Sequence, residues 1–447
     1  MGNRFLEGAY APVTEEVTAH DLAVTGTVPA WLDGRYLRNG PNPIDAGDPA
    51  TYHWFTGDGM VHGLRLRDGK AEWYRNRWVR SQAVATALGE PWPGGPVHAG
   101  MDIAPNTNII GHAGRTFAIV ESGPCPYELT DELDTVGPTD LNGTLPGGYT
   151  AHPKRDPRTG ELHAVSYHWG WGEQVQYSVI GTDGRVRRCV DIPTTGSPMV
   201  HDCSLTESSV LIYDLPVDFD LDIAMNGGRF PYRWFDDQAA RVGVLPRDGT
   251  ADDVRWFEIE PCYVFHPLNA YDDGDRIVVD VVRHPRMFDL DRLGPNEGAP
   301  TLDRWTIDLA ADKVIEERLD DRAQEFPRVD ERRVGLRNRY AWSVGVAGDG
   351  DGNVDFGANA LLRHDLDGTG SLSRTFGRHL AAGEFVHVAA SPDAPEGDGI
   401  VMGIVFDGDR GASDLMILDA VTLEDVATVH LPARVPHGFH GNWIPMT

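Results

Sequence analysis

The chain is poor in cysteine and has no long apolar run, and both absences narrow its class. Its 447 residues include four cysteines and no C-x-x-C pair, so buried free thiols are expected rather than disulfides or metal ligands. The four are Cys125, Cys189, Cys203 and Cys262. No stretch approaches the roughly 18 apolar residues of a membrane-spanning helix, and residues 1–12 lack the apolar part of a signal peptide. We therefore expect a cytoplasmic protein.

Positive charge is scarce as well. Lysine and arginine together number 39 against 68 aspartates and glutamates, which gives a net charge of −29 at pH 7. Nucleic-acid-binding proteins present stripes of positive charge to phosphates, so this balance argues against a nucleic-acid partner. It argues equally against electrostatic binding to anionic membranes. No feature of the sequence indicates an obligate protein partner.

Several common catalytic signatures are missing. The chain has no G-x-S-x-G elbow, no P-loop and no G-x-G-x-x-G after a strand, so triad, nucleotide-phosphate and dinucleotide chemistry are unsupported. Its histidines in apolar settings show neither of the spacings H-x-x-x-H and H-x-E that are typical of zinc sites. A functional site therefore has to be assembled from residues that lie far apart in the sequence.

What the chain does contain is a long series of short β-type segments. Alternating or β-branched runs occur at 115–120, 210–213, 276–282 and 400–406. Asp-Gly pairs, which favour the type I′ turns of β-hairpins, occur at 58–59, 68–69, 183–184, 248–249, 367–368 and 398–399. With 51 glycines and 31 prolines, this pattern predicts an all-β chain. Short helices are expected at Arg80–Leu88 and Asp218–Asn226.

Closure of the sheet structure is expected for so many strands, because it removes exposed strand edges. Strand–hairpin–strand units of about forty to fifty residues favour a propeller over stacked sandwiches. No low-complexity linker interrupts the chain, so residues 1–447 are expected to form a single domain. The innermost strands of a propeller border a central channel, where residues distant in the sequence can meet.

Four histidines in short apolar or turn-forming settings are candidates for such a meeting. They are His152, His201, His266 and His440. His152 is followed by Pro153 and His201 by Asp202, while His266 lies between Phe265 and Pro267 and His440 between Phe439 and Gly441. Taken singly, each is more often a core residue than a ligand. Gathered on one axis, they would form an all-nitrogen metal site, which suits iron, copper, zinc or nickel.

Three glutamates lie in similarly distinctive settings at expected strand ends. They are Glu121, Glu325 and Glu384. A metal-bound histidine usually donates its other N–H to a carboxylate, which fixes the tautomer and strengthens the ligand. Three carboxylates could support four histidines in this way. The alternative is that they are exposed charges at strand ends, which is common in an acidic protein.

Seven short motifs, taken together, resemble the carotenoid cleavage oxygenases. They are Arg38-Asn39-Gly40-Pro41-Asn42-Pro43, the run 53–62, Ala151-His152-Pro153, Val200-His201-Asp202, Phe265-His266-Pro267-Leu268-Asn269, Glu325-Phe326-Pro327-Arg328 and Gly438-Phe439-His440-Gly441. Each motif is weak by itself, but all seven occur in the family's order from residue 35 to the C-terminus.

The resemblance implies a seven-bladed β-propeller with one non-haem iron(II) ion, Fe(2+), on its axis and a dome of loops and short helices above it. The implied iron ligands are His152, His201, His266 and His440. The implied carboxylate partners are Glu121 for His201, Glu325 for His266 and Glu384 for His440. His152 is then the ligand without a carboxylate, and His437 is not a ligand although it lies three residues before His440.

The implied reaction is the cleavage of an alkene by O2 into two carbonyl products. Four neutral imidazoles would leave the metal ion its full positive charge and two adjacent open coordination positions. The negative charge of the carboxylates would lie one coordination shell further out. Such a reaction needs positioning, a metal and an apolar pocket rather than acid–base groups. By the same resemblance, Thr107 places a methyl group beside one open position. The alternative for Thr107 is a surface residue in an Asn-rich turn.

The nature of the alkene depends on the residues around the site. Relatives that cleave phenolic alkenes such as stilbenes typically carry a lysine just before the first glutamate, where this chain has Val120. Without that donor a phenol would be poorly paired, so a carotenoid or apocarotenoid is favoured, with an aryl alkene as the alternative. Phe55, Val120 and Phe265 are expected to line the cleft. The stretch Phe219–Trp234 is a candidate apolar rim for weak peripheral membrane contact.

Two other functions remain open at this point. A catalytically silent propeller used for binding would keep the histidines as structural residues. A metal-dependent hydrolase would be expected to bind its metal mostly through carboxylates, which the all-histidine pattern opposes.

Overall fold

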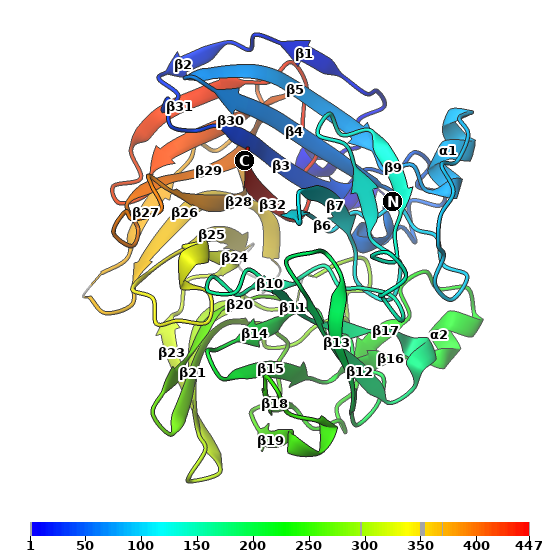
Figure 1. Ribbon diagram of the computed structural model, residues 1–447. Coiled ribbons are helices and arrows are strands. Elements are labelled where there is room, and N and C mark those ends of the chain that lie inside the picture. Colours follow the sequence, from blue (N-terminus) through cyan, green and yellow to red (C-terminus); the bar gives the residue numbers. More distant parts are fainter. Residues whose placement is uncertain (1, 296, 349–353, 369, 447) are drawn as a thin grey trace.

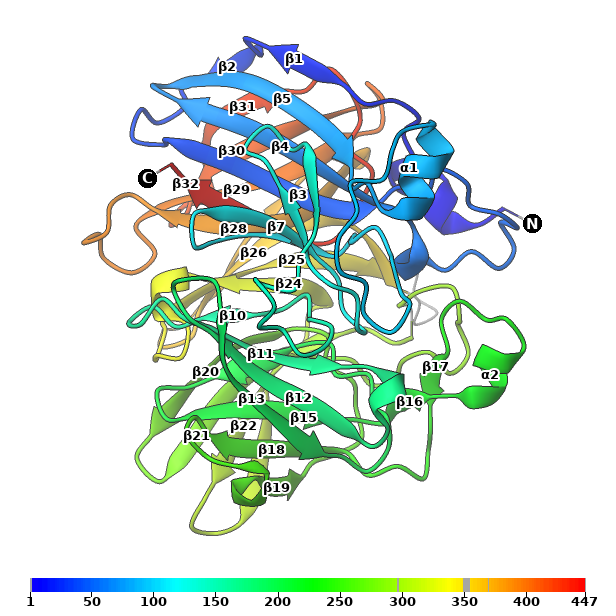
Figure 2. The ribbon, with the colours of Figure 1, turned by 45° about the vertical axis from the view of Figure 1, so that its right-hand side comes forward.

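The computed structural model describes residues 2–295, 297–348, 354–368 and 370–446. In this part of the chain short antiparallel sheets are arranged around an axis as a seven-bladed β-propeller (Figure 1). The all-β seven-bladed architecture expected from the sequence is confirmed. Short helices, 3-10 turns and loops cover the side of the ring where α1 and α2 lie, on the right of Figure 2, and form a dome.

The first four blades follow the chain with one exchange between its ends. Blade 1 contains β1 (Thr18–His20), β5 (Lys70–Trp78), β4 (Gly59–Arg67), β3 (Gly34–Pro41) and β32 (Gly441–Pro445). Blade 2 contains β6 (Asn108–His112), β7 (Arg115–Ile119), β8 (Tyr127–Leu129) and β9 (Thr135–Pro138). Blade 3 contains β10 (Lys154–Arg155), β11 (Leu162–Tyr167), β12 (Gln174–Ile180) and β13 (Val186–Pro193). Blade 4 contains β14 (Cys203–Leu205), β15 (Ser209–Asp214), β18 (Arg241–Pro246) and β19 (Arg255–Glu258).

The last three blades complete the ring. Blade 5 contains β20 (Pro267–Asp273), β21 (Arg276–Arg283), β22 (Thr301–Asp308) and β23 (Lys313–Asp320). Blade 6 contains β24 (Gln324–Val329), β25 (Tyr340–Gly348), β26 (Val354–Asp365) and β27 (Leu372–Thr375). Blade 7 contains β28 (Leu380–Ala389), β29 (Gly399–Asp407), β30 (Ala412–Asp419), β31 (Asp425–His430) and β2 (Val24–Gly26). Blades 6 and 7 are joined in one sheet through the pair Ala358 and Ala382.

The two ends of the chain close the ring by exchanging strands. The C-terminal strand β32 pairs with β3 in blade 1, while the N-terminal strand β2 pairs with β31 in blade 7. Both exchanges are antiparallel and join segments about 400 residues apart, so the first and last blades cannot separate without breaking sheet hydrogen bonds.

The elements outside the blades are short. They are α1 (Gln82–Leu88), α2 (Leu221–Met225), the hairpin of β16 (Val217–Phe219) and β17 (Tyr232–Trp234), and the 3-10 turns η1 (Arg4–Leu6), η2 (Gly8–Tyr10), η3 (Trp54–Thr56), η4 (Trp169–Trp171), η5 (Ala251–Asp253) and η6 (Glu331–Arg333). Within the described residues, no helix has the length and apolar character needed to cross a membrane.

Both expected helices exist, but they are shorter than predicted. The first begins at Gln82, where the Ser81 hydroxyl accepts a hydrogen bond from the backbone N–H of Val84 at 3.2 Å. The second prediction started too early, because Asp218 belongs to β16. Its helix begins after Asp220, whose carboxylate caps the first turn. The four predicted strand segments are confirmed by β7, β15, β21 and β29.

The prediction that Asp-Gly pairs mark tight hairpin turns was mostly wrong. Asp68-Gly69 joins β4 to β5 as a two-residue turn, with the expected positive φ of 49° and 74°. The other pairs lie in longer connections or at the starts of strands. At Gly59 and Gly399 the glycine is needed for close packing, because a Cβ there would overlap the carbonyl oxygens of Pro105 and Val388.

The cysteines are free, as expected, but they are not all buried. Cys125, Cys203 and Cys262 lie in the core, whereas Cys189 is exposed. Cys189 lies on β13, the last strand of blade 3, where side chains alternate between the blade and solvent. Burial was therefore predicted wrongly for this residue.

Several histidines away from the axis are buried in a neutral form, which predicts a loss of stability in mild acid. Burial lowers the pKa of these side chains to about 3 or 4; they are His53, His62, His163, His364 and His387. In the unfolded chain a histidine titrates near 6.5. Below that pH the unfolded state binds protons that the folded state does not, so the free energy of unfolding falls as the pH falls.

Lowering the pH from 7 to 5.5 is expected to decrease the free energy of unfolding of the metal-free protein by about 1 kcal/mol for each fully buried histidine. His201 opposes this trend: burial lowers its pKa, but the carboxylates of Glu121, Asp202 and Glu325 together raise the pKa by more. Urea unfolding midpoints measured at the two pH values test the prediction. Equal midpoints would contradict it.

Candidate metal centre and substrate cavity

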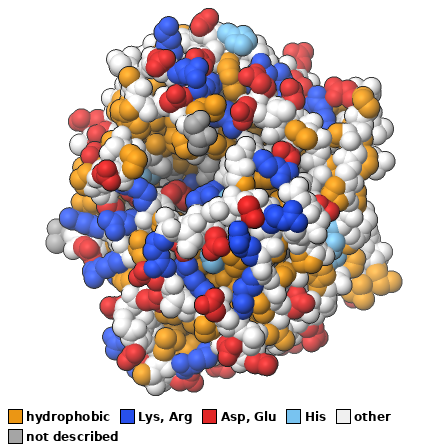
Figure 3. Space-filling model, in the orientation of Figure 1, with side chains coloured by type: hydrophobic (Ala, Val, Ile, Leu, Met, Phe, Trp, Pro, Cys, Tyr) orange, Lys and Arg blue, Asp and Glu red, His pale blue; other side chains and the backbone are white. Residues whose placement is uncertain are grey.

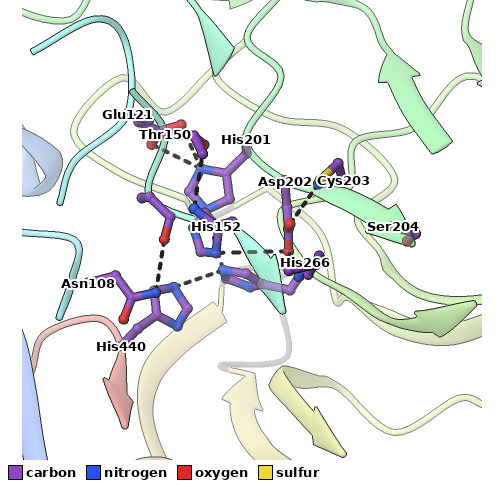
Figure 4. Close-up of polar contacts among 12 residues, drawn as sticks. Asn108, Glu121, Thr150, His152, His201, Asp202, Cys203, Ser204, His266 and His440 are labelled. Atoms are coloured by element: carbon purple, nitrogen blue, oxygen red, sulfur yellow. Dashed lines mark hydrogen bonds and ion pairs between the residues drawn. The ribbon is translucent and has the colours of Figure 1, made fainter. Parts of the chain in front are cut away.

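The four candidate histidines meet on the propeller axis. Each of them lies one or two residues before the innermost strand of a blade. His152 precedes β10, His201 precedes β14, His266 precedes β20 and His440 precedes β32. All four are buried, and one ring nitrogen from each lies within 4.8 Å of the others (Figure 4). The Nε2 atom of His266 is 3.3 Å from Nε2 of His201 and 3.1 Å from Nε2 of His440.

Carboxylates bind the far side of three of these rings. Nδ1 of His201 lies 2.9 Å from both carboxylate oxygens of Glu121. Nδ1 of His266 lies 2.6 Å from Glu325, and Nδ1 of His440 lies 2.9 Å from Glu384. These are the three pairs that the family resemblance implied. Because each carboxylate accepts a hydrogen bond, each Nδ1 is the protonated nitrogen and each Nε2 carries a lone pair.

The convergence of lone pairs makes this cluster fit a metal ion. The Nε2 atom of His152 is buried and has no hydrogen-bond partner within the described residues. Burial, and then the neighbouring imidazoles, lower the pKa of His152 far below its usual value, and they lower that of His266 to about 3 against the opposing effect of Glu325. His152 and His266 are therefore neutral donors. Lone pairs this close repel one another unless a cation lies among them.

The three glutamates have further partners that sequence reasoning missed. Glu121 accepts a hydrogen bond from the Tyr167 hydroxyl at 2.9 Å. Glu325 also contacts Nε2 of His284 at 2.8 Å. Both partners come from strands or loops far away in the sequence, and neither has a local motif that could have identified it.

Glu384 is held by a cation and a backbone amide. Arg328 Nη1 lies 3.4 Å from one of its oxygens, and the backbone N–H of Gly441 donates to the other at 2.8 Å. Burial alone would raise the pKa of Glu384, but Arg328 and His440 outweigh it and lower the pKa to about 2. The carboxylate is therefore ionised at neutral pH and can keep the proton on His440 Nδ1.

His152 differs from the other three, as the resemblance implied. The nearest carboxylate that contacts it is Asp202, whose Oδ2 is 3.8 Å from Nδ1, too far for a hydrogen bond (Figure 4). That oxygen instead accepts a hydrogen bond from Lys154 at 2.7 Å. Within the described residues, His152 thus has no directly bonded carboxylate.

An apolar cavity of about 370 Å³ lies on one side of the histidines. The three expected lining residues, Phe55, Val120 and Phe265, all border it. Phe55 packs edge-on against Phe265 and Phe439, and Phe265 packs edge-on against His201, with ring centroids 5.0–5.9 Å apart. A second, more polar cavity of about 120 Å³ also borders the histidines and is lined in part by Lys154 and Asp202.

Thr107 also borders the apolar cavity, beside His440. Its backbone carbonyl accepts a hydrogen bond from the His440 N–H at 3.0 Å, and its hydroxyl donates to Asn106 at 3.0 Å. Asn106 in turn donates to the backbone carbonyls of Phe55 and Gly57. Thr107 is therefore a buried residue of the site and not a surface residue of an Asn-rich turn.

His437 lies outside the cluster, although it is close to His440 in the sequence. Its ring contacts Tyr10 and Trp54, with centroids 5.0 and 6.0 Å away. His437 is buried, so it is a core residue of the dome. The histidine that joins the cluster is the second of the pair, His440.

The expected apolar rim is only partly exposed. Leu221 and Met225, on α2, are 61% and 77% exposed, and Figure 3 shows apolar side chains at this projecting edge on the right. Tyr232 and Trp234, from the same stretch, are buried instead. The strand β17 turns these two rings inward, and Tyr232 lines the apolar cavity.

Fold and site together define a β-propeller with an all-histidine, carboxylate-supported site suited to a metal ion and an apolar cavity beside it. The family model described as retinal pigment epithelial membrane protein matches residues 10–445. A carotenoid cleavage oxygenase of Mycobacterium tuberculosis is 53% identical over 496 residues, covering 100% of this chain and 98% of the relative. The chain belongs to this family, the carotenoid cleavage oxygenases.

Solved structures agree with this assignment. The lignostilbene dioxygenase of Pseudomonas brassicacearum superposes with a TM-score of 0.89 at 28% identity and covers 100% of both chains. A cobalt-substituted apocarotenoid oxygenase of Synechocystis superposes with a TM-score of 0.87 at 26% identity, covering 97% of each chain. This chain is thus similar to members named for both kinds of alkene.

Proposed function

We propose that the protein is a non-haem iron(II) dioxygenase that cleaves a C=C bond of a carotenoid or apocarotenoid with O2, giving two carbonyl products. The observation that carries this proposal is the convergence of four imidazole nitrogens beside an apolar cavity. The proposed ligands of the one iron ion are His152, His201, His266 and His440. When bound, the iron supplies the binding and activation of O2.

The protein residues hold the metal ligands, orient the substrate and exclude water. Glu121, Glu325 and Glu384 keep three imidazoles in the tautomer that presents Nε2. Aromatic side chains keep water out of the cavity and position the alkene. Thr107, with its hydroxyl engaged by Asn106, would present its methyl group to the reacting side. No acid–base residue is required, because an alkene and O2 give two carbonyls without net proton transfer.

The preference for a carotenoid or apocarotenoid is supported by Val120 and by the name of the 53% identical relative. Cleavage of a stilbene or another phenolic alkene to aromatic aldehydes is the alternative, supported by the likeness to a lignostilbene dioxygenase. The two differ in whether the cavity offers a polar partner to the substrate. Val120 can only pack against it.

Val120→Lys is expected to shift the preference toward 4-hydroxystilbene by roughly 10-fold in kcat/KM, because a buried ammonium can bind the phenol oxygen. The measurement is the ratio of kcat/KM for 4-hydroxystilbene and an apocarotenal in both proteins. Val120→Met is the control for side-chain length without charge. An unchanged ratio in Val120→Lys would remove this position from the specificity argument.

Oxygen uptake tests the proposed activity. Protein reconstituted anaerobically with iron(II) should consume O2 when an apocarotenal or a carotenoid is added, and should be inactive when made metal-free. Failure to retain iron, or iron retention without oxygen uptake on any carotenoid, apocarotenoid or stilbene, would overturn the proposal and favour a binding protein.

We also propose a cytoplasmic location with peripheral membrane contact through α2, where the polyene would enter. The exposed Leu221 and Met225 support this contact. The short α2 projects from the dome (Figure 2), and Phe230 and Tyr232, which follow it in the chain, line the apolar cavity.

A further inference from the structure

One hydroxyl in the wall of the apolar cavity, that of Tyr232, donates to no acceptor within the described residues. Tyr232, on β17, lines the cavity and is 3% exposed. Its hydroxyl oxygen is buried and has no hydrogen-bond partner at normal length within the described residues. The Ser122 side chain lies close enough to act on that oxygen as a donor and so to lower its pKa, which leaves the O–H hydrogen of Tyr232 free to donate. Burial raises the pKa of this hydroxyl, so it stays a neutral donor. A buried donor without a partner is destabilising, and such a group in a cavity wall is suited to a ligand.

The other hydroxyls near the metal centre are already engaged. Tyr167 donates to Glu121 at 2.9 Å, and Thr107 donates to Asn106 at 3.0 Å. Each of these bonds serves the histidine cluster or its supporting loop. Tyr232 has no such task in the part of the cavity that the structure describes.

The Tyr232 ring is held firmly in place. It packs edge-on against Tyr167 and Phe219, with centroids 5.8 and 6.0 Å away, and lies 5.7 Å from Phe230. A ring fixed on three sides cannot turn its hydroxyl away to find another partner. The donor is therefore preorganised, and a ligand atom that meets it pays little ordering entropy.

The loop that carries Ser122 has a strained backbone and places Ser122 beside the Tyr232 hydroxyl. Ser122 has a φ of 66°, in the left-handed region that non-glycine residues rarely adopt, and Gly123 follows with a φ of 110°. Both come directly after Glu121, which bonds His201. The loop therefore places Glu121 against the histidine cluster and Ser122 in the cavity wall beside Tyr232.

We propose that the Tyr232 hydroxyl donates a hydrogen bond to an oxygen atom of the substrate, which selects an oxygenated alkene over a pure hydrocarbon. This inference rests on the proposed alkene-cleaving function. The oxygen has two possible sources, the phenolic hydroxyl of an aryl alkene and the carbonyl or hydroxyl group of an apocarotenoid. Tyr232 supplies the polar partner that Val120 cannot supply, and a hydrocarbon end would leave the donor unpaired.

The test compares binding of matched ligand pairs to iron-loaded enzyme kept under nitrogen, so that no ligand is consumed. One pair is trans-4-hydroxystilbene and trans-stilbene; the other is an apocarotenal and the hydrocarbon with a methyl group in place of its aldehyde. Dissociation constants follow from quenching of tryptophan fluorescence. Tyr232→Phe should weaken binding of the oxygenated member of one pair by roughly 10-fold and leave its hydrocarbon partner unchanged. The affected pair identifies the source of the oxygen.

Tyr263→Phe is the matched control. Tyr263 is also fully buried, but its hydroxyl donates to the backbone carbonyl of Met199 at 2.9 Å. Its removal should change both members of each pair equally. Equal effects of Tyr232→Phe on both members, no effect on either oxygenated ligand, or no binding of either pair to the parent would overturn the inference. Iron retention and oxygen uptake test the proposed function separately, so the two failures are distinguishable.

Discussion

Replacing His266 by alanine is expected to abolish stoichiometric iron binding. Its Nε2 atom lies 3.3 Å from that of His201 and 3.1 Å from that of His440, so it is adjacent to two of the other proposed ligands. Removing it leaves three imidazoles, and it also leaves Glu325 without one of its two histidine partners. Iron per chain, measured by atomic emission after anaerobic reconstitution and desalting, should fall from about one to near zero.

His437→Ala is the matched control for this variant. His437 is a buried histidine three residues from His440, but it packs against Tyr10 and Trp54 and does not join the cluster. Its replacement should leave the iron content unchanged even if it lowers stability. Parent-like iron in His266→Ala would refute the proposed ligand set.

Glu325→Gln is expected to weaken iron binding by roughly 10–100-fold without abolishing it. Glu325 is buried and accepts hydrogen bonds from both His266 and His284. Burial raises the pKa of Glu325, but these two histidines lower it by a larger amount, so the carboxyl group is an anion in the native site. A neutral amide removes that charge, makes His266 a weaker donor and can present an N–H to a ring that needs an acceptor.

The measurement for this variant is the iron(II) dissociation constant from competition with a chromogenic chelator under nitrogen. Glu317→Gln, on the outer strand β23, removes an exposed carboxylate and should leave the constant unchanged. An affinity of Glu325→Gln equal to that of the parent would show that the carboxylate does not support the ligand.

Much of the fold could be predicted from the sequence, because strand alternation and turn residues are local signals. The segments at 115–120, 210–213, 276–282 and 400–406 all became strands. Tight turns were less predictable. At Gly59 and Gly399 glycine is required because a carbonyl oxygen of another segment packs against its Cα. The local sequence contains no signal for such a contact.

Some residues of the candidate site could likewise be identified from the sequence, and others could not. The four histidines precede inner strands, and the family resemblance indicated both the histidines and their glutamates. The supporting partners Tyr167 and His284 had no such motif, since they reach the glutamates from other blades or loops. The sequence also predicts Tyr232 in an exposed rim, whereas β17 turns its side chain into the cavity.

Isotope labelling tests the central proposal most directly. Iron-loaded enzyme would be incubated with an apocarotenal, a carotenoid and a stilbene under 18O2, and products would be quenched and reduced at once to limit exchange with water. A dioxygenase that adds both atoms of O2 across one C=C bond predicts two carbonyl products for the cleaved substrate, each carrying one 18O atom. Label in only one product, or in neither, would contradict the account.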